Sequence, residues 1–143
     1  MIIGVLKEPS PETRVSLLPE HVAILKKWNV DVLVESNAGV TAFANDGKYT
    51  EAGANIKSRS EVLQRSDFIV SINALPQSEI TDLKSKVILG VYQPLFNAGL
   101  MKELAAKGLT VFSMDMLPRT TRAQSMDILS SQANIAGYKA VLL

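Results

Sequence analysis

The stretch DFIVSINALPQSEITDLKSKVILGVY, residues 67–92, decides the fold class. It contains two short runs, DFIVSI (67–72) and KVILGVY (86–92), in which apolar residues follow one another instead of alternating with polar ones. Strands that are apolar on both faces are typical of a parallel sheet covered by helices on both sides. The stretch therefore predicts two strands of a buried parallel sheet.

Four further runs have the composition of strands, and helical patterns fill the intervals between them. This alternation predicts a three-layer α/β domain of the flavodoxin or Rossmann-like kind. The four runs are IIGVL (2–6), DVLVE (31–35), ANIK (54–57) and TVFSM (110–114).

The first helical pattern begins at Pro19, a residue well suited to the first helical position. Leu18 before it is a poor N-cap, because it offers no side-chain acceptor. Asn29 is suited to a left-handed stop. The single histidine of the chain, His21, falls in the first turn, and we interpret it as a helix-surface residue rather than a catalytic one.

Two further helices have recognisable ends. SRSE (58–61) matches a capping box and predicts a short helix that ends near Ser66. Asn97 is predicted to cap a later helix, and Gly108 is predicted to end it.

Composition excludes several classes of function. The net charge is +1, from 15 basic and 14 acidic residues without a basic cluster, which argues against nucleic acid as the main ligand. The absence of cysteine excludes disulfides, thiolate nucleophiles and cysteine-based zinc sites, and one histidine cannot build a multi-histidine metal site, so we expect no metal. No run of about 18 apolar residues is present, so we expect no membrane span in this chain.

The glycines do not form a dinucleotide fingerprint. The pattern G-x-G-x-x-G requires two glycines that bracket a single residue, and no pair in this chain does so. We therefore expect this chain alone not to hold a dinucleotide by its phosphates.

The chain closes on PRTTRAQSMDILSSQANIAGYKAVLL (118–143). This pattern predicts a long helix that begins near Thr121 or Ser125, where TRAQ (121–124) matches a capping box. No helix terminator precedes Leu143, so we expect the chain to be part of a longer protein. The predicted division is an α/β domain, residues 1–120, and the start of an inter-domain linker helix, residues 121–143.

A first candidate ligand site is KEPSPETRVSLLPE (7–20), which follows the first strand. Open α/β sheets place ligands at the carboxyl ends of their strands, and the planar fork of Arg14 suits a carboxylate. The alternative is a rigid surface loop with an internal Arg–Glu pair, and spacing alone favours that alternative. We expect most of the scattered carboxylates Glu8, Glu12 and Glu20 to be solvated.

A second candidate site lies before the final helix. Arg119, Gln124 and Asp127 put a cation, an amide and a carboxylate on a loop that enters a helix, and such a set can grip a polar planar group such as a carboxamide. In the alternative, the three residues have only local roles: Gln124 caps the helix, the charge of Asp127 interacts favourably with the helix N-terminus, and Arg119 is solvated. The residues alone do not decide between the two.

Three segments of the chain carry a resemblance to a known family. They are MDMLPRTTRAQSMDILSSQANIAGYKAV (114–141), IGVLKEPSPETRVSLLPEHVAIL (3–25) and VLVESNAGVTAFANDGKYTEAGANI (32–56). These segments resemble the NAD(H)-binding component of the proton-translocating NAD(P) transhydrogenases, and the opening is also similar to alanine dehydrogenase. The resemblance covers essentially the whole chain.

The resemblance implies two α/β domains around a cleft, with the Rossmann domain beyond this chain. It implies hydride transfer from NADH to NADP⁺ coupled to proton translocation, with NAD(H) on this component and NADP(H) on a partner membrane subunit. It further implies a homodimer of the full component at the cytoplasmic side of the bacterial inner membrane. We expect the isolated chain to be inactive and to bind NADH weakly or not at all.

By the same resemblance, Arg119, Gln124, Asp127 and Ser130 contact the nicotinamide end of NAD(H). Arg119 and Ser130 would hold the carboxamide or neighbouring polar groups, Gln124 would face the NADP-bearing component, and Asp127 would fix the loop. Hydride transfer needs alignment and exclusion of water but no acid or base, so the shortage of histidine is no objection.

Alanine dehydrogenase is the alternative enzyme. Arg14 matches its arginine, whereas its lysine position falls on Asn73 and its histidine position falls near Gln93. Amides cannot replace an ionic lysine or a proton-shuttling histidine, so we keep Arg14 only as a possible cleft residue. A non-catalytic interaction module of the same fold is the remaining alternative.

Overall fold

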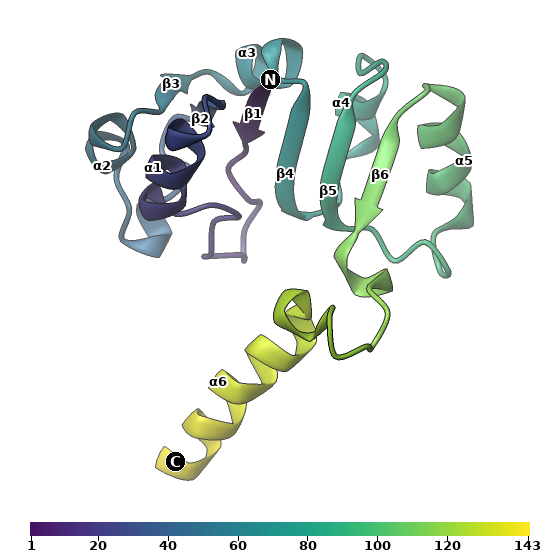
Figure 1. Ribbon diagram of the computed structural model, residues 1–143. Helices are drawn as coiled ribbons and strands as arrows, with labels where there is room; N and C mark the ends of the chain where they lie inside the picture. The colour runs from purple at the N-terminus through teal and green to yellow at the C-terminus, as the bar shows by residue number, and fades with distance from the viewer.

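The computed structural model describes residues 1–143, and its centre is one parallel sheet of six strands in the order β3-β2-β1-β4-β5-β6 (Figure 1). All five neighbouring pairs are parallel. Every predicted strand is confirmed, with ends that differ by at most one residue from the predicted runs. The strands are β1 (Ile2–Val5), β2 (Asp31–Glu35), β3 (Asn55–Lys57), β4 (Phe68–Asn73), β5 (Val87–Val91) and β6 (Thr110–Ser113).

Helices connect the strands and complete the α/β architecture. Two of the short helices, α2 and α4, were not predicted, and Asn45 caps α2 by accepting a hydrogen bond from the Lys48 N–H at 3.0 Å. The α-helices are α1 (Pro19–Lys27), α2 (Asp46–Glu51), α3 (Arg59–Arg65), α4 (Gln77–Ile80), α5 (Ala98–Ala106) and α6 (Ile128–Leu142). The 3₁₀ turns are η1 (Val40–Ala42), η2 (Met114–Met116) and η3 (Gln124–Met126).

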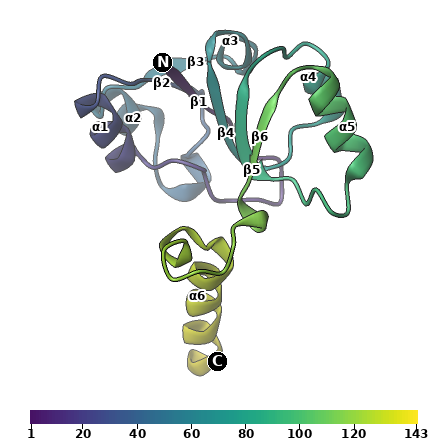
Figure 2. The ribbon, with the colours of Figure 1, turned by 45° about the vertical axis from the view of Figure 1, so that its right-hand side comes forward.

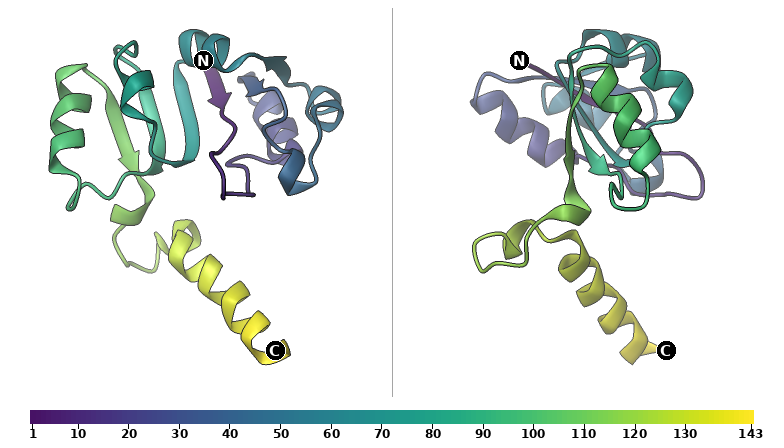
Figure 3. Two further views of the ribbon diagram at one scale, coloured as in Figure 1. Left: turned by 180° about the vertical axis from the view of Figure 1, so that it is seen from behind. Right: turned by 90° about the vertical axis from the view of Figure 1, so that its right-hand side faces the viewer.

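The two faces of the sheet have separate cores. Along β2, Val32 and Val34 belong to a core cluster with residues of α1 and α2, whereas Leu33 belongs to the cluster on the opposite face, which includes residues of α3, α4 and α5. This split follows from the alternation of side chains along a strand. Seen edge-on, the sheet has α1 on one side and α5 on the other (Figure 3). The predicted three-layer α/β fold is therefore confirmed.

The strand order reverses direction between β1 and β4. The chain runs outward from β1 through β2 to β3 and then returns to pair β4 with the other side of β1, where Val5 lies beside Val70. Connections from neighbouring strands diverge at such a switch point and leave a crevice at the carboxyl edge. The loop after β1 and the end of β4 therefore lie at the position where α/β sheets bind ligands.

Most predicted helix ends are confirmed. Leu18 makes no side-chain cap, Asn29 has a φ of 58°, and Ser58 and Glu61 form a complete capping box. Gly108 also ends its helix, with a φ of +66°. His21 is exposed on α1, as predicted.

Asn97 is the N-cap residue of α5, as predicted, but its side chain does not cap the helix. Its side chain accepts no hydrogen bond from the first turn of α5, and instead its amide Nδ2 donates to the Tyr92 carbonyl at 3.0 Å. The side chain thus ties the connection back to β5 rather than closing the helix.

The predicted start of the final helix is wrong. Neither Thr121 nor Ser125 begins it, because the chain makes the turn η3 first and α6 starts at Ile128, with Asp127 as its N-cap. From Leu129 onward the helix is exposed, and it projects away from the sheet (Figure 2). No helix of the chain combines the length and apolar character that crossing a membrane requires.

Candidate functional site

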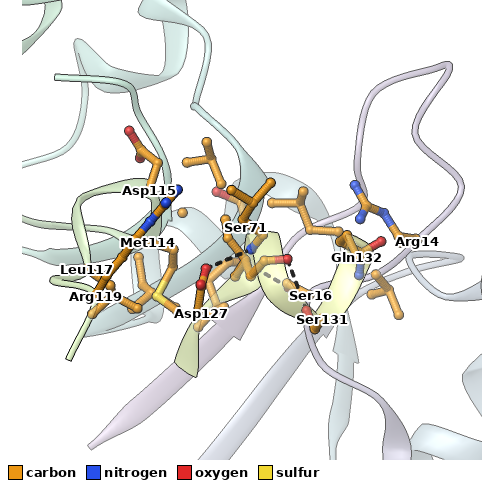
Figure 4. Close-up of a pocket in the computed structure, with 18 residues that line it drawn as sticks. Arg14, Ser16, Ser71, Met114, Asp115, Leu117, Arg119, Asp127, Ser131 and Gln132 are labelled. Carbon is orange, nitrogen blue, oxygen red and sulfur yellow. Dashed lines mark hydrogen bonds between the residues drawn. The ribbon is translucent and has the colours of Figure 1, made fainter. Parts of the chain in front are cut away.

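The larger of two adjoining cavities lies at the carboxyl edge of the sheet, beside the switch point. Its volume is about 620 Å³, and the ends of β4 and β5 form its floor (Figure 4). Val70, Ile72 and Leu89 give this floor an apolar character, while the loop after β1 and the start of α6 supply polar side chains at its borders. The cavity therefore suits a flat apolar group with polar substituents at its edge.

Arg14 lies at one end of this cavity and Arg119 at the other (Figure 4). Arg14 is engaged by Glu12, with Nε 2.9 Å from Oε1 and Nη2 2.6 Å from Oε2. The hydrogen bonds from Arg14 lower the pKa of Glu12 to about 2, and the same pairing raises the pKa of Arg14. The internal Arg–Glu pair is thus present, and Arg14 nevertheless borders the cavity.

A second cavity, of about 490 Å³, adjoins the first. Arg119 and Asp127 border both cavities. All four residues expected to contact nicotinamide line this second cavity, namely Arg119, Gln124, Asp127 and Ser130. The turn η3 begins at Gln124 and ends just before Asp127, so it lies between Arg119 and the first turn of α6.

Asp127 organises this second cavity. One carboxylate oxygen accepts from the Leu129 N–H at 2.9 Å, and the other accepts from the Ser130 hydroxyl at 2.7 Å. The Ser130 hydrogen bond, the backbone of the first turn and the nearby charge of Arg119 all lower the pKa of Asp127. The carboxylate is therefore held ionised, and it fixes the Ser130 side chain relative to Arg119.

Arg119 and Gln124 keep free hydrogen-bonding groups. Both side chains are exposed, and neither forms a hydrogen bond or ion pair within the chain. An arginine and an amide without internal partners can bond the oxygen and nitrogen of a carboxamide without first breaking other contacts. These two side chains are therefore free to hold a polar planar group such as a carboxamide.

Glu8 is a residue whose environment the sequence did not reveal. The expectation of a solvated carboxylate is wrong for it, because Glu8 is buried and its two oxygens accept hydrogen bonds from Ile72 and Asn73. These partners are more than 60 positions away along the chain, so no local pattern indicates them. Glu8, Ser71 and Asn73 border a third cavity on the other side of the β4 end.

The chain offers no cradle for phosphates. The glycine pattern of a dinucleotide loop is absent, and no group of three or more histidine, aspartate or glutamate side chains converges where a metal ion could be held.

The fold and its cavities define a parallel α/β domain with a ligand cleft at the switch point of its sheet. Residues 4–136 match the family described as alanine dehydrogenase/PNT, N-terminal domain. The chain belongs to this family.

Within the family, the chain is similar over nearly its full length to transhydrogenase subunits. It is 42% identical to NAD(P) transhydrogenase subunit alpha of Haemophilus influenzae, over 99% of this chain and 28% of that protein. It is 36% identical to NAD(P) transhydrogenase subunit alpha of Cereibacter sphaeroides, over 92% of this chain and 25% of that protein. The chain thus spans about a quarter of the length of these relatives.

Solved structures show the same likeness. The structure of transhydrogenase from Sinorhizobium meliloti superposes with a TM-score of 0.92 at 38% identity, over 99% of this chain and 43% of that one. The structure of an L-alanine dehydrogenase gives a TM-score of 0.78 at 26% identity, over 85% of this chain and 34% of that one. The fold is shared with both enzymes, and the likeness extends further for the transhydrogenase.

Proposed function

We propose that this chain is the N-terminal domain of the NAD(H)-binding alpha subunit of a proton-translocating NAD(P) transhydrogenase. Its role is to hold the nicotinamide end of NAD(H) while a hydride passes from NADH to NADP⁺. The observation that carries this proposal is the convergence of Arg119, Gln124, Asp127 and Ser130 on one cavity beside an apolar cleft.

Each residue has a distinct role. Arg119 donates hydrogen bonds to the carboxamide oxygen or to neighbouring polar groups, and the Ser130 hydroxyl, whose proton is donated to Asp127, accepts a hydrogen bond from the carboxamide NH₂. Asp127 holds Ser130 in place through the 2.7 Å bond between its carboxylate and the Ser130 hydroxyl, and it caps α6. Gln124 lies exposed at the border of the cavity, where the NADP(H)-bearing component would approach.

Direct hydride transfer explains why the site needs no acid or base. A bound nicotinamide supplies the hydride chemistry, and the protein contributes alignment and exclusion of water. The apolar floor of the larger cavity provides a surface against which a ring can lie without ordered water.

The proposal assigns the remaining functions to segments beyond this chain. A Rossmann domain of the same subunit would grip the phosphates, so residues 1–120 would form the N-terminal domain and 121–143 the start of the inter-domain helix. The partner would be the NADP(H)-binding membrane subunit, with the full component a homodimer on the cytoplasmic side of the bacterial inner membrane. The isolated chain would then be inactive.

Two features count against an alanine dehydrogenase activity. The fork of Arg14 already binds the carboxylate of Glu12, and the amide of Asn73 is bonded to Glu8 at 3.0 Å. Both side chains are thus already engaged within the chain. The coding sequence after Leu143 would distinguish the enzyme from a non-catalytic interaction module. A G-x-G-x-x-G motif there would support the enzyme.

The test is the rate of hydride transfer in the full-length subunit assembled with its partner. We expect Arg119→Ala and Asp127→Ala each to lower turnover by about tenfold or more, because misalignment of reacting groups is costly. Arg122→Ala is the matched control, since Arg122 is exposed on the same loop but borders neither cavity. Unchanged turnover in both test variants would remove the proposed site.

A further inference from the structure

Glu8 is the one carboxylate of the chain that is buried, and the proposed function gives it no role. Only 8% of the residue is exposed. Its Oε1 accepts from the Ile72 N–H at 2.6 Å, and its Oε2 accepts from the Asn73 N–H at 3.1 Å and from Asn73 Nδ2 at 3.0 Å. Three donors thus offset the cost of taking this carboxylate out of water.

These bonds extend the sheet beyond its last backbone pair. The pairing of β1 with β4 ends at Val5 beside Val70, and the pairing of β4 with β5 shifts register between Val70 and Asn73. The amides of Ile72 and Asn73 therefore lie where the regular ladder has ended. The Glu8 side chain replaces the missing strand and fixes the direction of the β4 end.

A second bond ties the same loop to β4. The Ser16 hydroxyl donates to the Val70 carbonyl at 3.1 Å. Between Glu8 and Ser16 the loop carries Arg14, and both Arg14 and Ser16 border the larger cavity (Figure 4). Val70 and Ile72 of β4 line the same cavity. The two ties thus hold one wall of the cavity against its floor.

We propose that Glu8 is a positioning residue for the nicotinamide cleft, acting through the backbone of Ile72 and Asn73. This inference rests on the proposed function. Glu8 does not border the larger cavity itself, so it shapes the cleft without touching what the cleft holds. Its bonds set where the apolar floor ends and where the loop with Arg14 stands.

The decisive substitution is Glu8→Gln in the full-length subunit. It preserves the volume of the side chain, but its amide NH₂ turns a donor toward the donors of Asn73 or Ile72. The double variant Glu8→Gln with Asn73→Asp reverses the polarity of the side-chain pair, so a Gln NH₂ again meets a carboxylate. Glu20→Gln is the control, because Glu20 is exposed and forms no ion pair.

Three readouts are compared: the NADH dissociation constant by calorimetry, the KM for each nucleotide, and the hydrogen exchange of the peptide that spans β4. For Glu8→Gln we expect faster exchange at the end of β4 and a rise of about tenfold in the dissociation constant and KM for NADH. The KM for NADP⁺ stays unchanged. The double variant recovers some of the loss, and Glu20→Gln behaves as the unaltered subunit.

Faster exchange with unchanged NADH affinity would overturn the inference, because it would leave Glu8 only a role in folding. Equal losses for NADH and NADP⁺, or a double variant no better than the single one, would also overturn it. Failure of the unaltered subunit to bind NADH is a different result, since it refutes the proposed function itself.

Discussion

Replacement of Arg59 by methionine should destabilise the carboxyl edge of the sheet. Arg59 begins α3 and makes four hydrogen bonds: two to Glu79 at 2.6 and 2.9 Å, one to Glu35 at 2.8 Å and one to the Lys7 carbonyl at 3.0 Å. The side chain thus connects the ends of β1 and β2 to the first turn of α4. Its removal leaves two carboxylates facing each other without a cation.

The cost follows from the burial of these groups. The side chain of Arg59 is 30% exposed, and those of Glu35 and Glu79 are 14% and 22% exposed. Exposed pairs contribute roughly 0.2–1 kcal/mol and charged hydrogen bonds in protected positions roughly 1.5–3 kcal/mol. Arg59 forms two such ion pairs, and at about 1.5 kcal/mol for each we expect Arg59→Met to lower the free energy of unfolding by about 3 kcal/mol.

Urea denaturation followed by circular dichroism measures this loss. With a slope of about 2 kcal/mol per molar urea, the midpoint should fall by about 1.5 M. Arg65→Met is the matched control, because Arg65 is exposed at the other end of the same helix and forms no ion pair. Equal midpoints for the two variants would refute the reasoning.

Two further predictions concern packing and acid stability. A Cβ at Gly4 would lie 2.8 Å from Val62 Cγ1 on α3, so Gly4→Ala should lower the free energy of unfolding by about 1–3 kcal/mol. Gly99 has open space around it, so Gly99→Ala should be neutral or stabilising in the same urea titration. The pKa of Glu12 is lowered from 4.5 to about 2 by Arg14, so the pair's contribution is complete above pH 4.5 and is lost as the pH falls toward 2. Because half of the Arg14 side chain is exposed, that contribution is about 1 kcal/mol or less. Glu12→Gln should therefore flatten the pH dependence of the free energy of unfolding only between pH 4.5 and about 2. A stability difference between the two proteins that persists unchanged at pH 2 would contradict this prediction.

The sequence predicted those features that depend on neighbouring residues. The apolar runs at 67–72 and 86–92 identified buried parallel strands, because strands covered on both faces have no polar alternation to maintain. The capping box at Ser58 and Glu61 was equally predictable from the sequence, since both of its hydrogen bonds lie within one turn.

The features that were missed depend on distant partners or on competing acceptors. The side chain of Asn97 bonds to the Tyr92 carbonyl instead of the first turn of α5, and the donors to Glu8 lie on β4. At the final helix, Asp127 rather than Thr121 is the N-cap, because its carboxylate accepts hydrogen bonds from both a backbone N–H and a hydroxyl in the first turn. The residues of the candidate site could be named from the resemblance, but their gathering around one cavity requires the turn η3.

A crystal structure of the full-length subunit with NADH bound tests the central claim most directly. We expect the nicotinamide ring to lie over the apolar floor near Val70 and Leu89, with its carboxamide within hydrogen-bonding distance of Arg119 or Ser130. A ring bound far from the loop that precedes α6 would contradict the proposed site.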